Sequence, residues 1–155
     1  MSGRGASEWI VRDDGEECDG PGSFRLSTDP GLVDLDLVHG FLTDSYWRPG
    51  VSRETVSRAI AGSIPFTLID DREVQVGFSR VVTDRATFAY LGDVFVVEAW
   101  RGRGLGDWMV GRILAHPQLR GIARWSLYTA DAHRLYAKHG FTAPAHPDWA
   151  MEIAE

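Results

Sequence analysis

The sequence predicts a single α/β domain with a mixed, largely antiparallel sheet, and three observations support this prediction. The chain has 155 residues, a length typical of one domain. Its 44% apolar and 25% charged residues are enough to build a core with a solvated surface. Strand-like and helix-like patterns alternate along the chain, and three consecutive strand-like runs are separated only by short turns.

The chain opens with a polar segment. Residues 1–23 are rich in glycine and acidic side chains, so we expect a polar, flexible leader followed by one folded domain over residues 24–155. Within the leader, residues 9–12 could add an edge strand. Residues 24–27 alternate apolar and polar side chains and predict the first strand of the domain, and a turn follows at residues 29–31.

The middle of the chain predicts two helices and an antiparallel meander. Apolar side chains at helical spacing indicate a helix over residues 32–42. Ser52 is a suitable N-cap for a second helix, which ends at Ala61 before Gly62. Three strand-like runs come next, joined by turns that suit antiparallel pairing: residues 66–69, 74–82 and 88–97.

The last third of the chain predicts two more helices and two more strands. Residues 104–116 have helical spacing, and Pro117 prevents the helix from continuing. We expect a strand at residues 125–128, a short helix at residues 132–140 and a final strand at residues 150–153. After the leader, the predicted order is therefore β α α β β β α β α β.

Charge and composition exclude several classes of protein. The formal net charge of −6 disfavours a nucleic-acid-binding protein, which needs a basic surface. The longest apolar run, residues 94–97, is too short to predict a membrane span. Cys18 is the only cysteine, so neither an intrachain disulfide nor a cysteine zinc site is expected, and the histidine spacing predicts no metal site. These features favour a protein of the reducing cytoplasm.

The most informative segment is a strand that leads through a glycine-rich bend into a helix. Residues 102–106 contain three glycines, which allow a sharp turn and a close approach of the backbone to a ligand. The helix that follows offers unpaired N–H groups and the positive end of its dipole to an anion. Arg101 and Arg103 would be unfavourable beside that helix end unless an anion binds there. The segment therefore predicts a phosphate-binding site.

Two common phosphate-binding motifs do not fit this segment. A P-loop requires a lysine directly after its second glycine, but Lys138 is the only lysine in the chain. The dinucleotide fingerprint requires a glycine or alanine where this chain has Asp107 or Met109, depending on which glycine starts the motif. A doubly wound sheet is also disfavoured, because the pattern contains only one strand–bend–helix unit of this kind.

A third motif fits. Residues 101–106, Arg-Gly-Arg-Gly-Leu-Gly, match the Arg/Gln-x-x-Gly-x-Gly/Ala pyrophosphate loop of the GCN5-related N-acetyltransferase (GNAT) family. The preceding run, residues 91–97, resembles the fourth strand of that family. Residues 131–141 resemble its second signature, with Leu135-Tyr136 followed by Gly140-Phe141. The resemblance covers about residues 66–141 and implies a GNAT-like fold, with helices on both faces of the sheet and a splayed central strand pair.

The resemblance implies that residues 24–155 form an acetyltransferase domain that uses acetyl-CoA as co-substrate and needs no metal. The acceptor would be a small-molecule or peptide amine, which attacks the thioester directly in a ternary complex. Dimers are common in the family, so a homodimer is compatible with the resemblance. The residues expected to bind the cofactor are Phe95, Val96, Val97, Arg101, Gly102, Arg103, Gly104, Leu105, Gly106 and Asp107.

Two proton transfers define the candidate catalytic residues. An alkylammonium with a pKa of about 10.4 must lose a proton before it attacks, which costs roughly 4–5 kcal/mol at pH 7. Asp93 is the first candidate for the base, and Glu98 the second. By resemblance, Tyr136 protonates the departing thiolate. Tyr46 and Trp47, in the loop between the first two helices, are weaker candidates for the acceptor site.

Other interpretations stay open at this point. Tyr136 could be a core residue at helical spacing, and Asp93 could serve only as a hydrogen-bonding residue of the strand. A non-catalytic module that binds or senses acyl-CoA would keep the glycine-rich bend but would need no acid. A covalent acyl-enzyme is not indicated, because Cys18 lies in the polar leader, outside both motifs.

Overall fold

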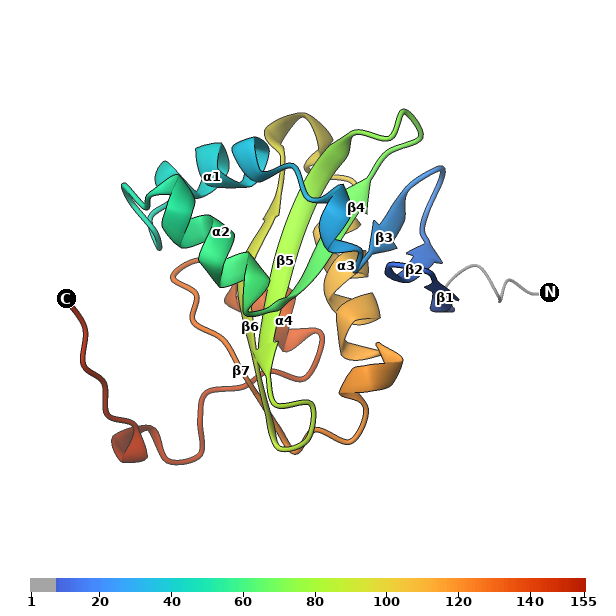
Figure 1. The fold of residues 1–155 in the computed structure, drawn as a ribbon. Helices are drawn as coiled ribbons and strands as arrows, with labels where there is room; N and C mark the ends of the chain where they lie inside the picture. Colours follow the sequence, from blue (N-terminus) through green and yellow to red (C-terminus); the bar gives the residue numbers. More distant parts are fainter. Residues whose placement is uncertain (1–7) are drawn as a thin grey trace.

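The computed structural model describes residues 8–155, and they form one seven-stranded mixed sheet with helices on both faces (Figure 1). The strands lie in the sheet in the order of the sequence. Only the last pair, β6 and β7, is parallel. The strands are β1 (Ile10–Arg12), β2 (Gly15–Asp19), β3 (Arg25–Ser27), β4 (Ile64–Ile69), β5 (Gln75–Thr83), β6 (Phe88–Val96) and β7 (Arg124–Ser126). The prediction of a single-domain, largely antiparallel α/β fold is confirmed.

The helices form two layers. The α-helices are α1 (Leu35–Thr43), α2 (Arg53–Ala61), α3 (Leu105–Leu114) and α4 (His133–Ala137). Short 3-10 turns lie at η2 (Pro30–Leu32), η3 (Glu98–Trp100), η4 (Pro117–Leu119) and η5 (Pro147–Trp149). Helices α1 and α2 pack on Phe78 and Phe95, whereas α3 and Tyr136 pack within a second, larger core cluster. None of the helices in residues 8–155 is both long and apolar enough to cross a membrane.

Local sequence signals explain the boundaries of the middle elements. The Ser52 side chain accepts a hydrogen bond from the Thr55 N–H, so α2 begins where a capping residue was predicted, and Gly62 lies at its other end. Asp34 caps α1 in the same way. Strands β4, β5 and β6 form the predicted antiparallel meander.

The N-terminal segment differs from the predicted leader. Residues 10–12 form the expected edge strand, but residues 15–19 add a second strand that pairs with β3. The Cys18 side chain is fully buried in the larger core cluster. The acidic side chains of β2 remain on the surface, where Glu17 pairs with Arg12 and Arg25. Residues 1–7, which also belong to the predicted leader, lie outside the described part of the chain.

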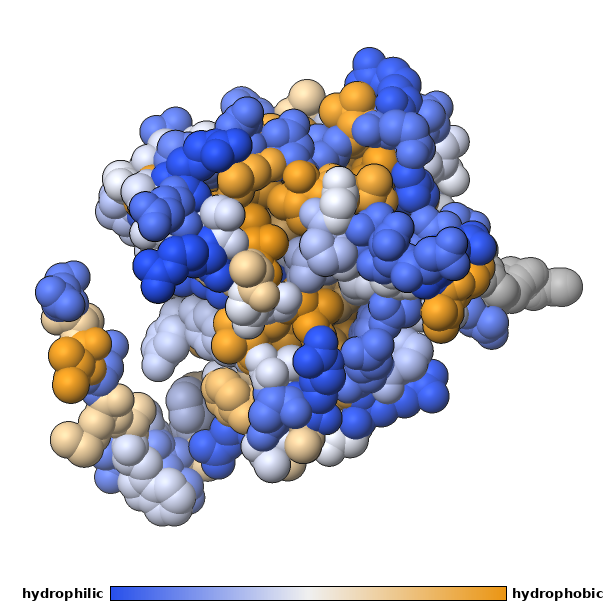
Figure 2. All heavy atoms as spheres, in the orientation of Figure 1, coloured by the Kyte–Doolittle hydropathy of each residue, from blue (hydrophilic) through white to orange (hydrophobic). Residues whose placement is uncertain are grey.

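The final strand predicted at residues 150–153 is absent. Every residue from 142 to 155 is exposed, and only the turn η5 interrupts an extended course. The segment leaves the domain at one side and projects away from it (Figure 1), with apolar side chains open to solvent (Figure 2). The alternating apolar pattern is present, but it has no neighbouring strand to pair with inside the monomer.

Candidate active site

Strands β6 and β7 separate partway along their length. They pair only through residues 88–90 of β6, and the rest of β6 continues without β7 beside it. The separation begins near a bulge, where Ser79 of β5 lies opposite both Asp93 and Val94 because the register shifts between Phe78 and Arg80. Asp93 has a left-handed φ of 55° there. The predicted splayed strand pair is therefore confirmed.

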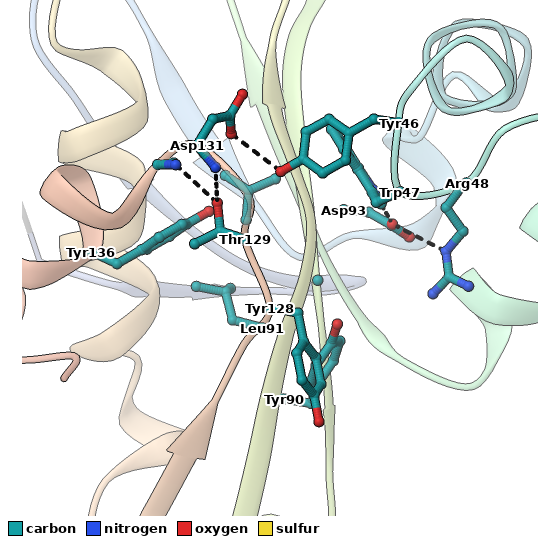
Figure 3. Close-up of a pocket in the computed structure, with 13 residues that line it drawn as sticks. Tyr46, Trp47, Arg48, Tyr90, Leu91, Asp93, Tyr128, Thr129, Asp131 and Tyr136 are labelled. Carbon is teal, nitrogen blue, oxygen red and sulfur yellow. Dashed lines mark hydrogen bonds and ion pairs between the residues drawn. The ribbon is translucent and has the colours of Figure 1, made fainter. Parts of the chain in front are cut away.

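A pocket of about 260 Å³ opens where the two strands separate (Figure 3). Its walls come from four parts of the chain: the α1–α2 loop, β6, the segment after β7, and α4. All four tyrosines of the chain lie in these walls. The lining residues are Tyr46, Trp47, Arg48, Tyr90, Leu91, Gly92, Asp93, Val94, Tyr128, Thr129, Asp131, Ala132 and Tyr136.

The Asp93 carboxylate is held by three donors. It accepts hydrogen bonds from Arg80 Nε at 2.6 Å, from Trp47 Nε1 at 3.0 Å and from Arg48 Nε at 3.5 Å. The side chains of Asp93 and Arg80 are both almost completely buried. The same carboxylate therefore neutralises a buried arginine and ties the α1–α2 loop to β6.

A second contact holds the α1–α2 loop beside the pocket. The Tyr46 hydroxyl donates to Asp131 Oδ1 at 3.2 Å and accepts from the Ala130 N–H at 3.0 Å. Residues 46 and 131 are 85 positions apart, and the bond joins the α1–α2 loop to the segment before α4 (Figure 3). The loop that contains Tyr46 and Trp47 is thus fixed at both sides of the pocket.

Tyr136 lies at the back of the pocket and points from α4 toward Thr129 (Figure 3). Burial, with smaller contributions from Tyr46 and Asp131, raises the pKa of the Tyr136 hydroxyl to about 12. The phenol therefore stays protonated at neutral pH and can act as a hydrogen-bond donor.

The glycine-rich bend has the backbone geometry that the motif predicted. Gly102 and Gly104 have φ angles of 80° and 77°, in the left-handed region that favours glycine. A Cβ at either position would meet no atom within 4 Å, so the space beside the bend is open. The first backbone bond of α3 runs from the Trp108 N–H to the Gly104 carbonyl. The amides that precede Trp108 in the first turn of α3 therefore have no acceptor within the helix and face a site suited to an anion.

The two arginines of the bend are held in different ways. Arg101 Nε donates to the Val96 carbonyl at 2.9 Å, which fixes the bend to the end of β6. The Arg103 guanidinium lies over the Trp100 ring, 4.5 Å from its centroid. The Asp107 carboxylate contacts His139 Nε2 at 2.7 Å, so its side chain is directed to α4 rather than to the bend.

The backbone at the end of β6 is only partly available to a ligand. The Val97 N–H donates to the Val76 carbonyl at 2.8 Å, and the Val97 carbonyl accepts from Trp100. Because the backbone polar groups of a strand alternate in direction, those of Val96 face away from β5 and into the gap. The Phe95 ring is buried and stacks on Phe41, with 4.0 Å between centroids.

The pocket thus brings together Asp93, Tyr136, Tyr46 and Trp47. Residues 101–107 are outside its lining and follow the far end of β6. Glu98, the second candidate for the base, is not part of its lining. No role was predicted from the sequence for five further residues of the site: Arg80, Arg48, Tyr90, Tyr128 and Asp131. Only Asp131 had a local signal, because it opens the second signature; the others are identified only by contacts between distant segments.

Burial also shows why the lone cysteine takes no part in the site. Cys18 lies in the core, and burial raises the pKa of its thiol to about 12. A thiol that stays protonated at neutral pH is a poor nucleophile.

Comparison with known proteins gives a consistent result. The sequence profile of the acetyltransferase (GNAT) domain matches residues 62–143. A solved GNAT-family protein from Xanthomonas campestris pv. campestris is 44% identical, with a TM-score of 0.83, over 88% of this chain and 96% of that one. A Gibberella zeae protein assigned as an acetyltransferase is 29% identical over an alignment of 140 positions, and the match covers 76% of this chain and 78% of that protein.

More distant solved structures share the fold alone. A Clostridium acetobutylicum protein solved with acetyl-CoA is 14% identical, with a TM-score of 0.60, and the match covers 84% of this chain and 94% of that one. The profile match includes β4 to β7, α3 and α4, and therefore both the glycine-rich bend and Tyr136. On the profile match and the Xanthomonas relative together, the chain belongs to the GNAT family of acetyltransferases.

Proposed function

We propose that this protein is an N-acetyltransferase that transfers an acetyl group from acetyl-CoA to a primary amine by direct attack in a ternary complex. One observation carries the proposal. The pocket lined by Tyr136 opens where β6 and β7 separate, and the bend at residues 101–107 is fixed to the far end of β6 by the Arg101–Val96 hydrogen bond. A long donor bound with its diphosphate at the bend would therefore extend along β6 and place its thioester at the pocket.

The residues of the bend fit a diphosphate. The free amides at the start of α3 and the open space beside Gly102 and Gly104 suit an anion, and Arg101 and Arg103 add positive charge. The polar groups of Val96 face the gap, and its amide can pair with an amide of the pantetheine arm as an added strand would. When bound, acetyl-CoA supplies an acetyl group already activated as a thioester.

The walls of the pocket suit a cationic amine. Four tyrosines and Trp47 offer aromatic faces and hydroxyl groups, and aromatic faces attract ammonium groups. Asp131 adds a carboxylate that is exposed at the pocket and forms no ion pair with the described residues. We therefore propose that the acceptor enters as an ammonium ion held by Asp131 and the aromatic walls.

The attacking amine must first lose a proton. Asp93, the base predicted from the sequence, already neutralises Arg80 and accepts hydrogen bonds from Trp47 and Arg48. Both of its carboxylate oxygens are thus occupied by these donors, so we assign Asp93 a positioning role that holds the α1–α2 loop. Asp131, directly or through a water molecule, is the better placed base because its second oxygen has no donor among the described residues.

The departing thiolate needs a hydrogen-bond donor, and Tyr136 is suited to this role. With a pKa of about 12, the phenol is protonated at neutral pH. Complete transfer to a thiolate with a pKa of about 8.5 would be uphill by about 5 kcal/mol. Tyr136 therefore keeps its proton and stabilises the developing negative charge by hydrogen bonding, and the released thiolate takes its proton from solvent.

The test is the substitution Tyr136→Phe, assayed with a panel of amines and detection of the free thiol. We expect turnover to fall by more than about tenfold, as for the loss of an acid or a charge-stabilising donor. Acetyl-CoA affinity, measured by calorimetry, should stay unchanged. Tyr128→Phe makes the same chemical change at the exposed wall of the pocket and should lower turnover less than about threefold.

Three results would contradict the proposal in different ways. Equal turnover in Tyr136→Phe and the unaltered protein would remove Tyr136 from the mechanism. Tight binding of acetyl-CoA with no thiol release from any amine would favour an acyl-CoA-sensing module. Stronger binding of ATP or NAD than of CoA would exclude the proposed donor.

A further inference from the structure

The pocket beside β6 carries charges of opposite sign on its two sides. Three charged residues line it: Arg48, Asp93 and Asp131. Asp131 lies on one side, where Tyr46 contacts it, and Arg48 and Asp93 lie on the other side (Figure 3). What the pocket offers to a ligand therefore depends on which of these charges are already balanced within the protein.

The charge of Asp93 is balanced from inside the domain. Arg80 Nε donates to Asp93 Oδ2 at 2.6 Å, and the two side chains are only 7% and 4% exposed. Arg80 Nη1 also donates to Ser63 Oγ at 3.1 Å, which holds the guanidinium in place. Arg80 and Asp93 thus form a neutral buried pair, and the positive charge of Arg48 is left over on this side of the pocket.

Arg48 has free hydrogen-bond donors. Its Nε lies 3.5 Å from Asp93 Oδ1, an oxygen that also accepts from Trp47 Nε1 at 3.0 Å. Its side chain is 41% exposed, and its terminal guanidinium nitrogens have no acceptor in the described part of the chain. The backbone is fixed, because the Arg48 N–H donates to Ser45 Oγ and the Arg48 carbonyl accepts from the Val51 N–H, both at 3.1 Å. A guanidinium with free donors on a fixed loop suits a carboxylate or a phosphate.

Tyr90 supplies a second donor in the same pocket. Its hydroxyl forms no hydrogen bond with the described residues. Burial raises the pKa of this hydroxyl, and the positive charge of Arg48 opposes the rise. The phenol is therefore protonated at neutral pH and can donate to an anion that Arg48 attracts.

The local charge of the pocket differs from that of the whole chain. The formal net charge of −6 favours cations in general. A diamine bound with one ammonium at Asp131 would nevertheless bring its second ammonium toward Arg48, where like charges repel. An uncharged group in that place would leave the Arg48 donors unpaired by the ligand. A ligand with one positive and one negative group matches both sides.

We propose that the acceptor is an amine that also carries an anionic group, a carboxylate or a phosphate, and that Arg48 and the Tyr90 hydroxyl bind this group while Asp131 holds the amine. Arg48 is then a specificity-determining residue, and the aromatic rings of Tyr46 and Trp47 lie between the two charged contacts (Figure 3). The inference rests on the proposed function, because it extends the acceptor site assigned there.

The test compares amines that differ only in the anionic group. The anionic probes are amino acids of increasing length, from glycine to 6-aminohexanoate, and O-phosphoethanolamine. The matched neutral probes are the carboxamides of the same amino acids and ethanolamine. For each pair, kcat/KM is measured by thiol release and the dissociation constant by calorimetry in the presence of CoA. We expect the unaltered protein to prefer the anionic member of at least one pair, and the responding pairs identify a carboxylate or a phosphate.

The substitution Arg48→Gln should lower this preference at least about tenfold, because a hydrogen-bonded charge contact is lost. Arg48→Lys should restore part of it, since the charge returns without the guanidinium fork. The matched control is Arg53→Gln, which removes the same charge from an exposed arginine of α2 that pairs with Asp36. It should leave the preference unchanged. Since the preference is a ratio within one variant, a general loss of activity cancels.

The outcomes separate this inference from the proposed function. Thiol release with no preference for any anionic probe would overturn the inference and leave the proposed function in place. An equal loss of preference in Arg48→Gln and Arg53→Gln would also overturn it, because net charge rather than a contact would then decide. Tight, Arg48-dependent binding of an anionic amine without thiol release from any probe would support the inference and contradict the proposed function.

Discussion

The glycine-rich bend and the pocket beside β6 offer different kinds of atoms to a ligand. The bend is a contiguous segment, residues 101–107, and it offers mainly backbone amides shaped by two left-handed glycines. The pocket is built from side chains of four separate segments, fixed by the Asp93 and Tyr46 contacts. Substitutions should therefore impair the bend and the pocket by different mechanisms. The bend is sensitive to backbone strain, and the pocket to the loss of a buried charge or hydroxyl group.

The proposed donor and acceptor need these two kinds of site for different reasons. Every acetyl-CoA molecule presents the same diphosphate, which backbone amides can bind without help from particular side chains. Acceptors differ from one another, and a pocket made of side chains can change its specificity while the fold stays constant. We therefore expect substitutions at the bend to change donor affinity, and substitutions in the pocket to change acceptor use or stability.

The largest effect is expected for Asp93→Ala. The substitution leaves the buried Arg80 without its charge partner and frees Trp47 and Arg48. Breaking a buried ion pair in this way should lower the free energy of unfolding by about 3 kcal/mol. For a chain of this size, that corresponds to a decrease of about 6–12 °C in melting temperature.

Asp36→Ala is the control for this prediction. It also removes an aspartate paired with an arginine, Arg53, but both side chains are largely exposed. Its effect on the free energy of unfolding should stay below about 1 kcal/mol, since exposed ion pairs contribute little. Equal effects of the two substitutions in thermal unfolding would show that Asp93 does not anchor the α1–α2 loop.

The second prediction concerns the bend. A valine in place of Gly104 would have to adopt a φ of 77°, which is strained for a branched side chain. Relaxation of the bend would turn its amides away from the anion site. We expect Gly104→Val to weaken acetyl-CoA binding about tenfold or more, measured by calorimetry.

Gly121→Val provides a matched control, because Gly121 has a φ of 78° and equally open surroundings. It lies between η4 and β7, outside the bend. Both variants should lose comparable stability, while only Gly104→Val should lose acetyl-CoA affinity. A similar loss of affinity in both would mean that general destabilisation, not the geometry of the bend, determines binding.

The fold could be predicted where neighbouring residues decide the structure. Ser52 and Gly62 mark the ends of α2, and short polar turns make the meander of β4, β5 and β6 antiparallel. The sequence did not reveal β2, because its acidic side chains resemble a solvated tail, whereas pairing with β1 and β3 and burial of Cys18 keep it in the sheet. The pattern at residues 150–153 predicted a strand, but a strand also requires a partner.

The site shows the same limit. Residues 101–106 and Tyr136 were predicted from their resemblance to two motifs of the GNAT family, because a local bend and a helix position determine where such residues lie. Asp93 was also found, but its tie to Arg80 depends on the register of β5 against β6. No local sequence pattern indicates that register, so the Asp93–Arg80 ion pair could not be predicted. The change in the proposed role of Asp93, from base to positioning residue, follows from that ion pair.

The smallest effect is expected for Tyr46→Phe, which tests whether the pocket and the bend act independently. The substitution removes the hydroxyl that joins Asp131 and the Ala130 amide, but it keeps the ring packed at 5.0 Å from Trp47. The loss of a hydrogen bond worth about 1 kcal/mol should raise the KM for the amine about fivefold. Acetyl-CoA affinity should not change, because the hydrogen-bond and ring partners of Tyr46 in the described chain are Asp131, Ala130 and Trp47, all outside the bend. Tyr128→Phe, whose hydroxyl makes no hydrogen bond with the described residues, should leave the KM for the amine within about twofold. If Tyr46→Phe weakened acetyl-CoA binding as much as amine binding, the two parts of the site would have to be treated as one coupled unit.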